Sequence, residues 1–430
     1  MDTWVKQAFD AIVIGSGPGG AAVARELSRH EKKVIILERG RADPIEGSLR
    51  QAARLALIPG QSLLFTEQLL ALVRGLTVGG SSILAYATAF DPPYEMFDRY
   101  GIDLRGEVAQ VKMELPLAVL SDDLVGPAAK WISRSALELG LPWEKLPKTV
   151  HQEKCRIECD KCTFGCPYGA KWTAREYIEE ARWQGATLLT GARVTGLEIE
   201  NNRVQSVRFK RDGHQKRVSA PLVILAAGGI GTPLILHASG IDNAGRNFFF
   251  DPLLIIYGFV DDLDGGAEFP MAAGFQDKSE GYILTDLMWP KAVYGIFTAE
   301  VMRFDRLPAQ SRRLPIMVKA KDDLGGTIQP HGGVRKRLSE ADRRRLSRGA
   351  SVAREILQHA GARHIFSTYY VATHPGGTAR INEVVDADLK TNLDNLFICD
   401  CSVIPEAWGL PPTLTILALG KRLGTHLASL

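Results

Sequence analysis

The chain has 430 residues, of which 45% are hydrophobic and 23% are charged, and its formal net charge is +3. Its length predicts two closely connected domains, and its small net charge excludes a general polyanion-binding field, so we expect no nucleic-acid partner. No apolar run approaches the ~20 residues of a membrane-spanning helix, so no integral membrane segment is expected. A strand is predicted within about ten residues of the N-terminus, which leaves no room for a secretory signal and indicates a cytoplasmic protein.

The first predicted elements are a strand, a glycine-rich turn, a helix and a second strand. An apolar run at residues 9–14 leads into Gly15-Ser-Gly-Pro-Gly-Gly20, and after a helical pattern a second apolar run ends at Glu38. In this context the glycines let the backbone approach a pyrophosphate, the helix N-terminus stabilises it, and the carboxylate accepts hydrogen bonds from a ribose. An acid there disfavours the 2′-phosphate of NADP. The alternative is a glycine turn without a ligand. The expected cofactor contacts are Gly15, Gly17, Pro18, Gly19, Gly20, Glu38 and Arg39.

A second glycine-rich segment follows at residues 79–82, and residues 67–74 before it are predicted to form a helix. Paired glycines and serines offer N–H groups and hydroxyls to an anionic or carbonyl-rich ligand, although alone they would indicate only a turn. The candidate contacts are Gly79, Gly80, Ser81 and Ser82.

Four of the six cysteines form the pattern C-x3-C-x2-C-x3-C-P. They are Cys155, Cys159, Cys162 and Cys166. The end of this pattern resembles the tail of the bacterial ferredoxin run, and thiolates this dense suit a metal centre. An iron–sulfur cluster is the favoured interpretation, since zinc sites usually pair two C-x2-C knuckles across a longer gap. Structural zinc, disulfides and free thiols are the alternatives. Cys399 and Cys401 are expected to be buried neighbours rather than ligands.

The region after residue 252 carries no nucleotide motif. Short β-like runs at residues 253–260, 281–284 and 293–297 predict the sheet of a substrate domain. Residues 303–348 are rich in Lys and Arg, and Ser339 with Asp342 marks the start of a helix. The basic residues indicate either a solvated helix face or a docking surface for an acidic electron carrier or partner subunit.

Three features stand near the C-terminus. A Thr-His-Pro-Gly-Gly-Thr segment contains His374, a later strand ends at Asp400, and Pro412 precedes a final helical pattern. Proline suits the start of a helix because its missing N–H is not needed there. For His374, the alternative to a catalytic role is a structural histidine in a turn.

These segments together resemble the glucose–methanol–choline (GMC) family of FAD oxidoreductases. The glycine turn at 15–20, the segment at 79–82, a second signature at 226–241 and the C-terminal block from His374 carry the resemblance. The resemblance implies an α/β fold, with a Rossmann-like FAD-binding domain and a discontinuous antiparallel-sheet substrate domain, as in p-hydroxybenzoate hydroxylase. It also implies FAD contacts from Val194, Ala227, Gly228, Asp400, Pro412 and Thr413.

The sequence departs from the family pattern at three places. Ala85 stands where an Asn usually contacts the flavin, and Pro252 replaces a His after Asp251. Residues 408–411 contain no second His or Asn before the last helix, so catalysis is expected to depend on His374 alone or the substrate differs from a plain alcohol.

The expected activity is that of an FAD-dependent dehydrogenase. His374 would accept the proton of a substrate hydroxyl while hydride passes to flavin N5, as a neutral imidazole can near pH 7. Some family members in multi-subunit complexes carry a cysteine cluster with the same ending, which implies an iron–sulfur cluster, four thiolates favouring 4Fe-4S, and a protein or quinone acceptor. The alternatives are an oxygen-using alcohol oxidase with structural zinc and a non-catalytic FAD and iron–sulfur electron-transfer subunit.

The expected domain organisation follows the order of these motifs. Residues 1–95 and 186–251 form the FAD-binding domain, interrupted by a helical cap region at 96–150 and by a cysteine-cluster insertion and helix at 151–185. Residues 252–370 form the substrate domain, and residues 371–430 form the C-terminal FAD-binding and catalytic segment.

Overall fold

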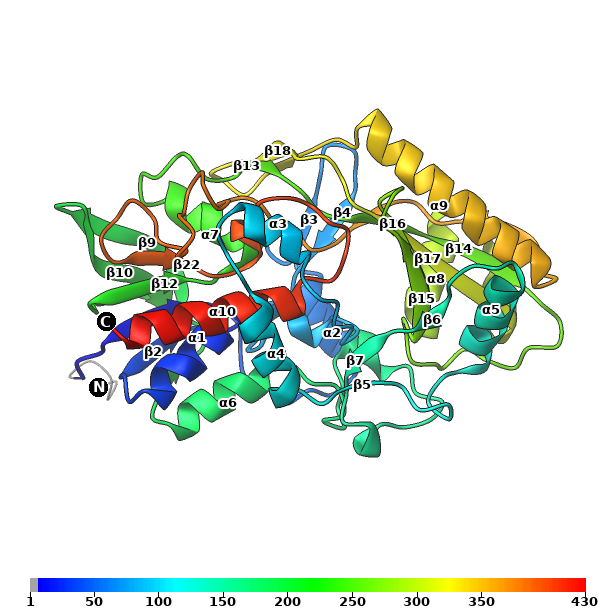
Figure 1. The fold of residues 1–430 in the computed structure, drawn as a ribbon, viewed down its shortest axis with the longest axis horizontal. Coiled ribbons are helices and arrows are strands. Elements are labelled where there is room, and N and C mark those ends of the chain that lie inside the picture. Colours follow the sequence, from blue (N-terminus) through cyan, green and yellow to red (C-terminus); the bar gives the residue numbers. More distant parts are fainter. Residues whose placement is uncertain (1–6) are drawn as a thin grey trace.

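The computed structural model describes residues 7–430, and one half of the molecule is built on a five-stranded parallel sheet (Figure 1). Its strands, in spatial order, are β22 (Leu396–Ile398), β12 (Leu222–Leu225), β1 (Ala11–Ile14), β2 (Val34–Leu37) and β8 (Thr187–Leu189). β1 and β2 are buried along their whole length, which explains their uninterrupted apolar sequences. The expected absence of a secretory signal falls partly on residues 1–6, which lie outside the described residues.

Helices cover the parallel sheet. α1 (Pro18–Arg29) packs against the last helix, α10 (Thr413–Ala428), and against α6 (Arg175–Trp183). The close approach of α10 requires Gly420, because a Cβ there would come within 2.7 Å of the Cβ of Ala22. Figure 1 shows that α10 begins in the middle of the molecule and runs toward the end where the C-terminus lies. Its N-terminus therefore lies between the two halves.

The other half is built on a nine-stranded sheet, which is antiparallel except where β21 pairs with β4. α5 (Pro127–Glu138) and α9 (Glu340–His359) pack against it. Its strands are β3 (Leu63–Phe65), β4 (Ala71–Val73), β21 (Val371–Ala372), β14 (Pro252–Phe259), β17 (Arg313–Ala320), β16 (Tyr282–Asp286), β15 (Ala273–Asp277) and β6 (Glu144–Lys145), with β20 (Arg363–Ser367) paired to β14.

Smaller sheets and short helices complete the fold. The strands are β9 (Arg193–Glu200), β10 (Arg203–Arg211), β11 (His214–Val218), β13 (Arg246–Phe248), β18 (Gly325–Ile328), β19 (Val334–Arg335), β5 (Leu117–Val119) and β7 (Pro147–Thr149). The helices are α2 (Leu49–Ala56), α3 (Tyr94–Arg99), α4 (Arg105–Glu114), α7 (Gly228–His237) and α8 (Lys291–Glu300). Over residues 7–430, no helix combines the length and the hydrophobicity needed to cross a bilayer.

The predicted architecture, a Rossmann-like sheet beside a discontinuous antiparallel sheet, is confirmed. The helix predicted to start at Ser339 is confirmed as α9, with a capping box between Ser339 and Asp342. Two local predictions are wrong. Residues 67–74 carry the turn and second strand of the hairpin β3–β4, because β4 pairs with the distant strand β21. Residues 293–297 lie in helix α8, whose buried Tyr294 and Thr298 stand four positions apart on one helix face.

Candidate functional site

The glycine turn between β1 and α1 is shaped by close backbone contacts. Gly15 has a φ of 106°, and a Cβ there would lie 2.2 Å from the carbonyl oxygen of Ala226. A Cβ on Gly17 would instead meet open space, and a Cβ on Gly80 would come within 3.1 Å of the Gly17 Cα. α1 begins after Gly17 without a side-chain cap, which leaves the N–H groups of its first turn for an anion. The turn therefore fits a diphosphate.

Glu38 is held rigidly at the end of β2. The N–H and the hydroxyl of Ser16 donate to its Oε2 at 3.0 and 2.6 Å, and the N–H of Gly40 donates to its Oε1 at 2.6 Å. Burial raises the pKa of Glu38, and these hydrogen bonds oppose the rise. The carboxylate thus lies beside the glycine turn, where a ribose-binding acid is needed.

Three arginines gather near the same turn. Burial and the charge of Arg39 lower the pKa of Arg74 to about 10, and burial and the charge of Arg193 lower the pKa of Arg39. Both Arg39 and Arg74 donate to Gln61, which brings their side chains together. The like charges repel one another, so an anion between them would be stabilised. Arg39 was among the predicted contacts, whereas Arg74 and Arg193 were not.

The serines of the 79–82 segment serve mainly to hold it in place. The hydroxyl of Ser82 donates to the carbonyl of Gly79 at 2.6 Å and accepts from the N–H of Ala174 at 3.0 Å. The hydroxyl of Ser81 accepts from the N–H of Gly75 at 3.0 Å. The segment is thereby fixed between the glycine turn and the start of α6.

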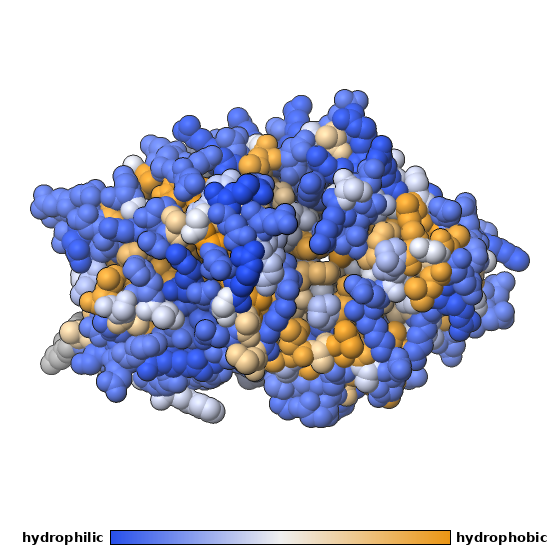
Figure 2. Space-filling model, in the orientation of Figure 1, coloured by the Kyte–Doolittle hydropathy of each residue, from blue (hydrophilic) through white to orange (hydrophobic). Residues whose placement is uncertain are grey.

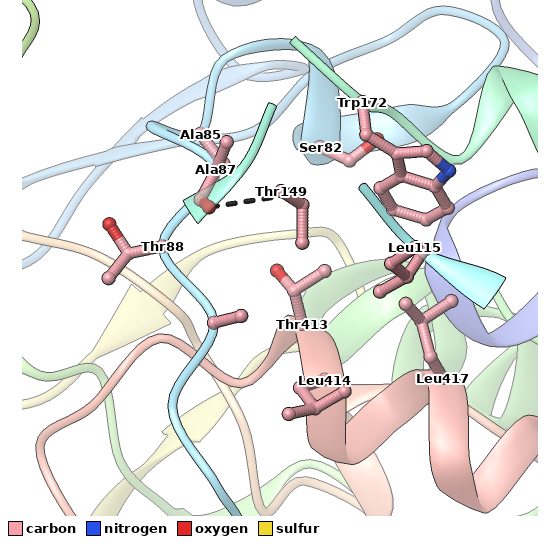
Figure 3. A pocket seen from close by; sticks show the side chains of 11 residues that line it. Ser82, Ala85, Ala87, Thr88, Leu115, Thr149, Trp172, Thr413, Leu414 and Leu417 are labelled. Carbon is pink, nitrogen blue, oxygen red and sulfur yellow. Dashed lines mark hydrogen bonds between the residues drawn. The ribbon is translucent and has the colours of Figure 1, made fainter. Parts of the chain in front are cut away.

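A cavity lies between this segment and the start of α10 (Figure 3). Thr413 points into it from the first turn of α10, and Trp172 forms another wall. Pro412 is the N-cap of α10, so the N-terminus of that helix borders the cavity. The surface is hollowed between the two halves of the molecule, and apolar residues gather there (Figure 2). The lining residues are Ser82, Ala85, Ala87, Thr88, Ala89, Leu115, Thr149, Trp172, Thr413, Leu414 and Leu417.

Asp400 joins the C-terminal block to the second glycine turn. Its Oδ2 accepts from the N–H of Gly228 at 2.8 Å and from the hydroxyl of Thr232 at 2.6 Å, and its Oδ1 accepts from the N–H of Ser402. Burial raises the pKa of Asp400 against these hydrogen bonds. Of the other predicted contacts, Ala227 is the N-cap of α7, and the half-buried Val194 lies in β9, away from this cluster.

His374 lies against two buried charged side chains. Its Nδ1 is 3.1 Å from Oδ2 of Asp251 and 3.5 Å from Nζ of Lys319. The His374 side chain is 26% exposed, whereas Asp251 is 1% and Lys319 2% exposed. Burial and the charge of Lys319 hold the pKa of His374 well below its usual value, so the imidazole is neutral at pH 7.

Strand order explains why these three residues meet. β21, β14 and β17 are neighbours, and β14 is antiparallel to both of the others. Asp251 immediately precedes β14, Lys319 is the next-to-last residue of β17, and His374 follows β21 by two residues. The start of β14 and the ends of the other two strands therefore lie at one edge of the sheet.

A buried ion pair supports Asp251 from behind. Asp322 accepts from the N–H of Asp251 at 2.9 Å and from the N–H of Phe250, and its carboxylate lies 2.9 Å from Nζ of Lys336. Asp251 has a φ of 42°, and this contact holds its backbone in that left-handed conformation.

The four clustered cysteines line one small cavity, together with Lys171 and Phe269. All are free thiols, so the disulfide alternative is not formed. Burial raises the pKa of Cys155 to about 11 and that of Cys162 to about 12, and charge on the neighbouring thiols adds to both rises. Within the part of the chain that the structure describes, no group of three or more His, Cys, Asp or Glu is placed so that it could hold a metal ion.

Sequence reasoning missed the charged neighbours of His374. Asp251 matched the family pattern but received no role, and Lys319 was not considered. The available signal was a single Lys in the apolar run of residues 314–320, a strand that is buried along its whole length. A charge at such a position needs a partner from elsewhere in the fold.

Comparisons with known proteins agree with this geometry. The GMC oxidoreductase family model matches residues 9–253 with its N-terminal part and residues 327–420 with its C-terminal part. An uncharacterised protein of Methanocaldococcus jannaschii is 26% identical over 96% of this chain and 98% of its own length. A long-chain-alcohol oxidase of Arabidopsis thaliana is 22% identical over 97% of this chain and 68% of its own length.

Solved structures share the fold. Pyridoxine 4-oxidase from Mesorbium loti superposes with a TM-score of 0.78 and 18% identity, covering 97% of this chain and 99% of that one. A formate oxidase of Aspergillus oryzae RIB40, whose study concerned FAD modification, gives a TM-score of 0.76 and 15% identity, with 98% of each chain covered.

Proposed function

The chain belongs to the GMC oxidoreductase family of FAD-dependent enzymes, and on that premise we propose that it oxidises a hydroxyl-bearing substrate with His374 as the base. The observation that carries the proposal is the contact between Nδ1 of His374 and Oδ2 of Asp251 at 3.1 Å. This contact fixes the imidazole with its Nε2 directed away from the carboxylate. A neutral imidazole in this orientation can accept the proton of an alcohol.

The residues present fit FAD. The uncapped start of α1 suits the diphosphate, Glu38 suits the ribose, and the cavity beside Thr413 suits the ring system. When bound, FAD supplies the hydride acceptor. The start of α10 borders the cavity, so its partial positive charge would stabilise negative charge there. The predicted contacts of residues 15–20, 38–39, 79–82, 227–228 and 400 surround the same region and are proposed to hold the cofactor.

In this mechanism the protein itself moves one proton. His374 takes the hydroxyl proton at Nε2, while Asp251 accepts the hydrogen bond from Nδ1–H and stabilises the imidazolium that forms. Asp322 and Lys336 keep the Asp251 backbone in place, so the imidazole is oriented before the substrate arrives.

The test is anaerobic reduction of the flavin, followed by loss of its visible absorbance. The first substrates are a long-chain alcohol, pyridoxine and formate, because relatives or structural neighbours are named for these substrates. We expect His374→Ala to slow reduction by a factor of about 10²–10⁴, as for loss of a general base. His331→Ala, a change of an exposed histidine, is the matched control. Unchanged reduction in His374→Ala would overturn the assignment and favour a non-catalytic electron-transfer subunit.

We further propose that the four-cysteine cavity holds an iron–sulfur cluster, which would supply one-electron transfer to a protein or quinone acceptor. The support is that four free thiols from one short segment line a single cavity. Trp172, which follows this segment closely, lines the cavity proposed for the flavin. The alternative is an oxygen-using oxidase with structural zinc, and several relatives and structural neighbours are named oxidases.

Anaerobic purification with iron, sulfide and zinc analysis separates these two cases. We expect iron and acid-labile sulfide, both lost in Cys162→Ser and kept in Cys399→Ala, whose cysteine lies outside the cavity. Zinc without iron would overturn the cluster. It would leave the role of His374 untouched.

A further inference from the structure

The segment before α10 provides no side chain that could assist His374. Its Trp408 ring packs against the rings of Phe97 and Phe249, with centroids 6.5 and 6.3 Å away, and so belongs to the core. The backbone of this segment nevertheless lies against the end of β17, since a Cβ on Gly409 would come within 2.7 Å of the backbone nitrogen of Lys321. A side chain from the end of β17 can therefore reach the place that the segment leaves empty.

Lys319 is that side chain. It lies in a strand whose eight residues are all buried, and the contact recorded for its Nζ is the 3.5 Å approach to Nδ1 of His374. An ammonium group buried in this way costs free energy unless a negative charge compensates it. The compensating charge is Asp251, whose carboxylate raises the pKa of Lys319, while burial lowers it to about 8.

The geometry around Nδ1 determines which ring nitrogen of His374 carries the proton. An ionised Asp251 can only accept a hydrogen bond, so its 3.1 Å contact requires a proton on Nδ1 and leaves the lone pair of Nε2 free. A protonated Asp251 would donate to Nδ1 instead and place the imidazole proton on Nε2. The second arrangement disables the base. The charge state of Asp251 therefore decides whether His374 can work.

We propose that Lys319 is a positioning residue that keeps Asp251 ionised, so that Asp251 fixes the Nδ1–H tautomer of His374 and Nε2 stays free to accept the substrate proton. This inference rests on the proposed role of His374 as the base. Lys319 thereby takes over, from a strand of the substrate domain, the assisting role that residues 408–411 cannot fill.

The charges around the site are consistent with this role. Burial raises the pKa of Asp251 to about 7 even with Lys319 beside it, and loss of that ammonium would raise it further. Behind it, Asp322 and Lys336 form a neutral buried pair. From the C-terminal segment, burial and the carboxylates of Asp400 and Asp251 raise the pKa of Cys401, which keeps this thiol uncharged.

The test is the pH profile of kcat/KM for flavin reduction in the FAD-loaded protein. Lys319→Met should move the acid limb upward by about one to three pH units, because the carboxyl then stays protonated to higher pH. The rate should recover above the shifted limb. Lys319→Arg keeps the charge and should leave the limb where it is in the unchanged protein. An unmoved limb in Lys319→Met, or an equal loss of rate at every pH, would overturn the inference.

A second measurement does not depend on the variant folding. ¹⁵N NMR of the unchanged holoprotein, with the His374 signals assigned by their loss in His374→Gln, reports the tautomer directly. We expect a protonated Nδ1 and an unprotonated Nε2 at pH 8, and an Nε2–H tautomer or an imidazolium there would overturn the inference. Flavin reduction that persists in His374→Ala would instead overturn the proposed function, so the two failures are distinguishable.

Discussion

The ammonium group of Lys171 donates a 2.8 Å hydrogen bond to the carbonyl oxygen of Cys162. The same group donates to the carbonyls of Ile83 at 2.6 Å and Ala85 at 2.7 Å, in the segment that follows residues 79–82. Lys171 is buried, so one cation joins the cysteine cavity to the wall of the cavity proposed for the flavin. The two sites therefore share a single structural support.

Replacing Lys171 should damage both sites together. Lys171→Met leaves three carbonyl oxygens without their donor, and a buried acceptor left unsatisfied costs about 1–3 kcal/mol. We expect lower FAD and iron contents after anaerobic purification and a lower unfolding temperature. Lys154→Met, at an exposed position just before the cysteines, is the control and should change none of these. Loss of iron with full retention of FAD would show that the two sites are independent.

The carboxylate of Glu38 should contribute strongly to FAD binding. Glu38→Gln keeps the size of the side chain but removes the charge that accepts from Ser16 and Gly40. Hydrogen bonds to a charged group are worth about 1.5–3 kcal/mol, so the Kd for FAD should rise by about 10- to 100-fold. The measurement is fluorescence titration of the apoprotein with FAD. An unchanged Kd would contradict the role of Glu38, and the exposed Glu31→Gln serves as the control.

Local sequence patterns were sufficient for the parts of the fold that depend on local interactions. The strands around the glycine turn, the cap of α9 at Ser339 and the start of α10 after Pro412 all follow from neighbouring residues. Residues 67–74 did not, because their strand is stabilised by pairing with β21, about three hundred residues away in the chain. A helical period over eight residues cannot reveal a partner so distant.

The candidate site shows the same division. The glycine turn and Glu38 lie within one short stretch, and their contacts could be predicted from spacing alone. The meeting of His374, Asp251 and Lys319 depends on the order of β21, β14 and β17 within the large sheet. Each of these residues looked isolated in the sequence, so only the strand order could bring them together.

Glu114 connects four helices through its carboxylate. Its Oε2 accepts from Arg25 of α1 at 2.6 Å and from the hydroxyl of Tyr177 of α6 at 2.9 Å, and its Oε1 accepts from Lys421 of α10 at 2.8 Å. Glu114 is itself the last residue of α4. Burial alone would raise the pKa of Glu114, but the hydrogen bonds from Lys421, Arg25 and Tyr177 outweigh it and lower the pKa to about 2.

The lowered pKa predicts a pH-dependent contribution of Glu114 to stability. Because the folded protein holds the ionised form more strongly than the unfolded chain, the contribution is complete above pH 4.5 and is lost as the pH falls toward about 2. Glu114→Gln should therefore lower the free energy of unfolding by about 2 kcal/mol at pH 7, measured by urea denaturation. The difference from the unchanged protein should shrink between about pH 5 and pH 3. Glu179→Gln, which removes an exposed pair with Arg182, should cost less than about 1 kcal/mol. A difference that stays constant with pH would show that Glu114 acts through packing rather than through its charge.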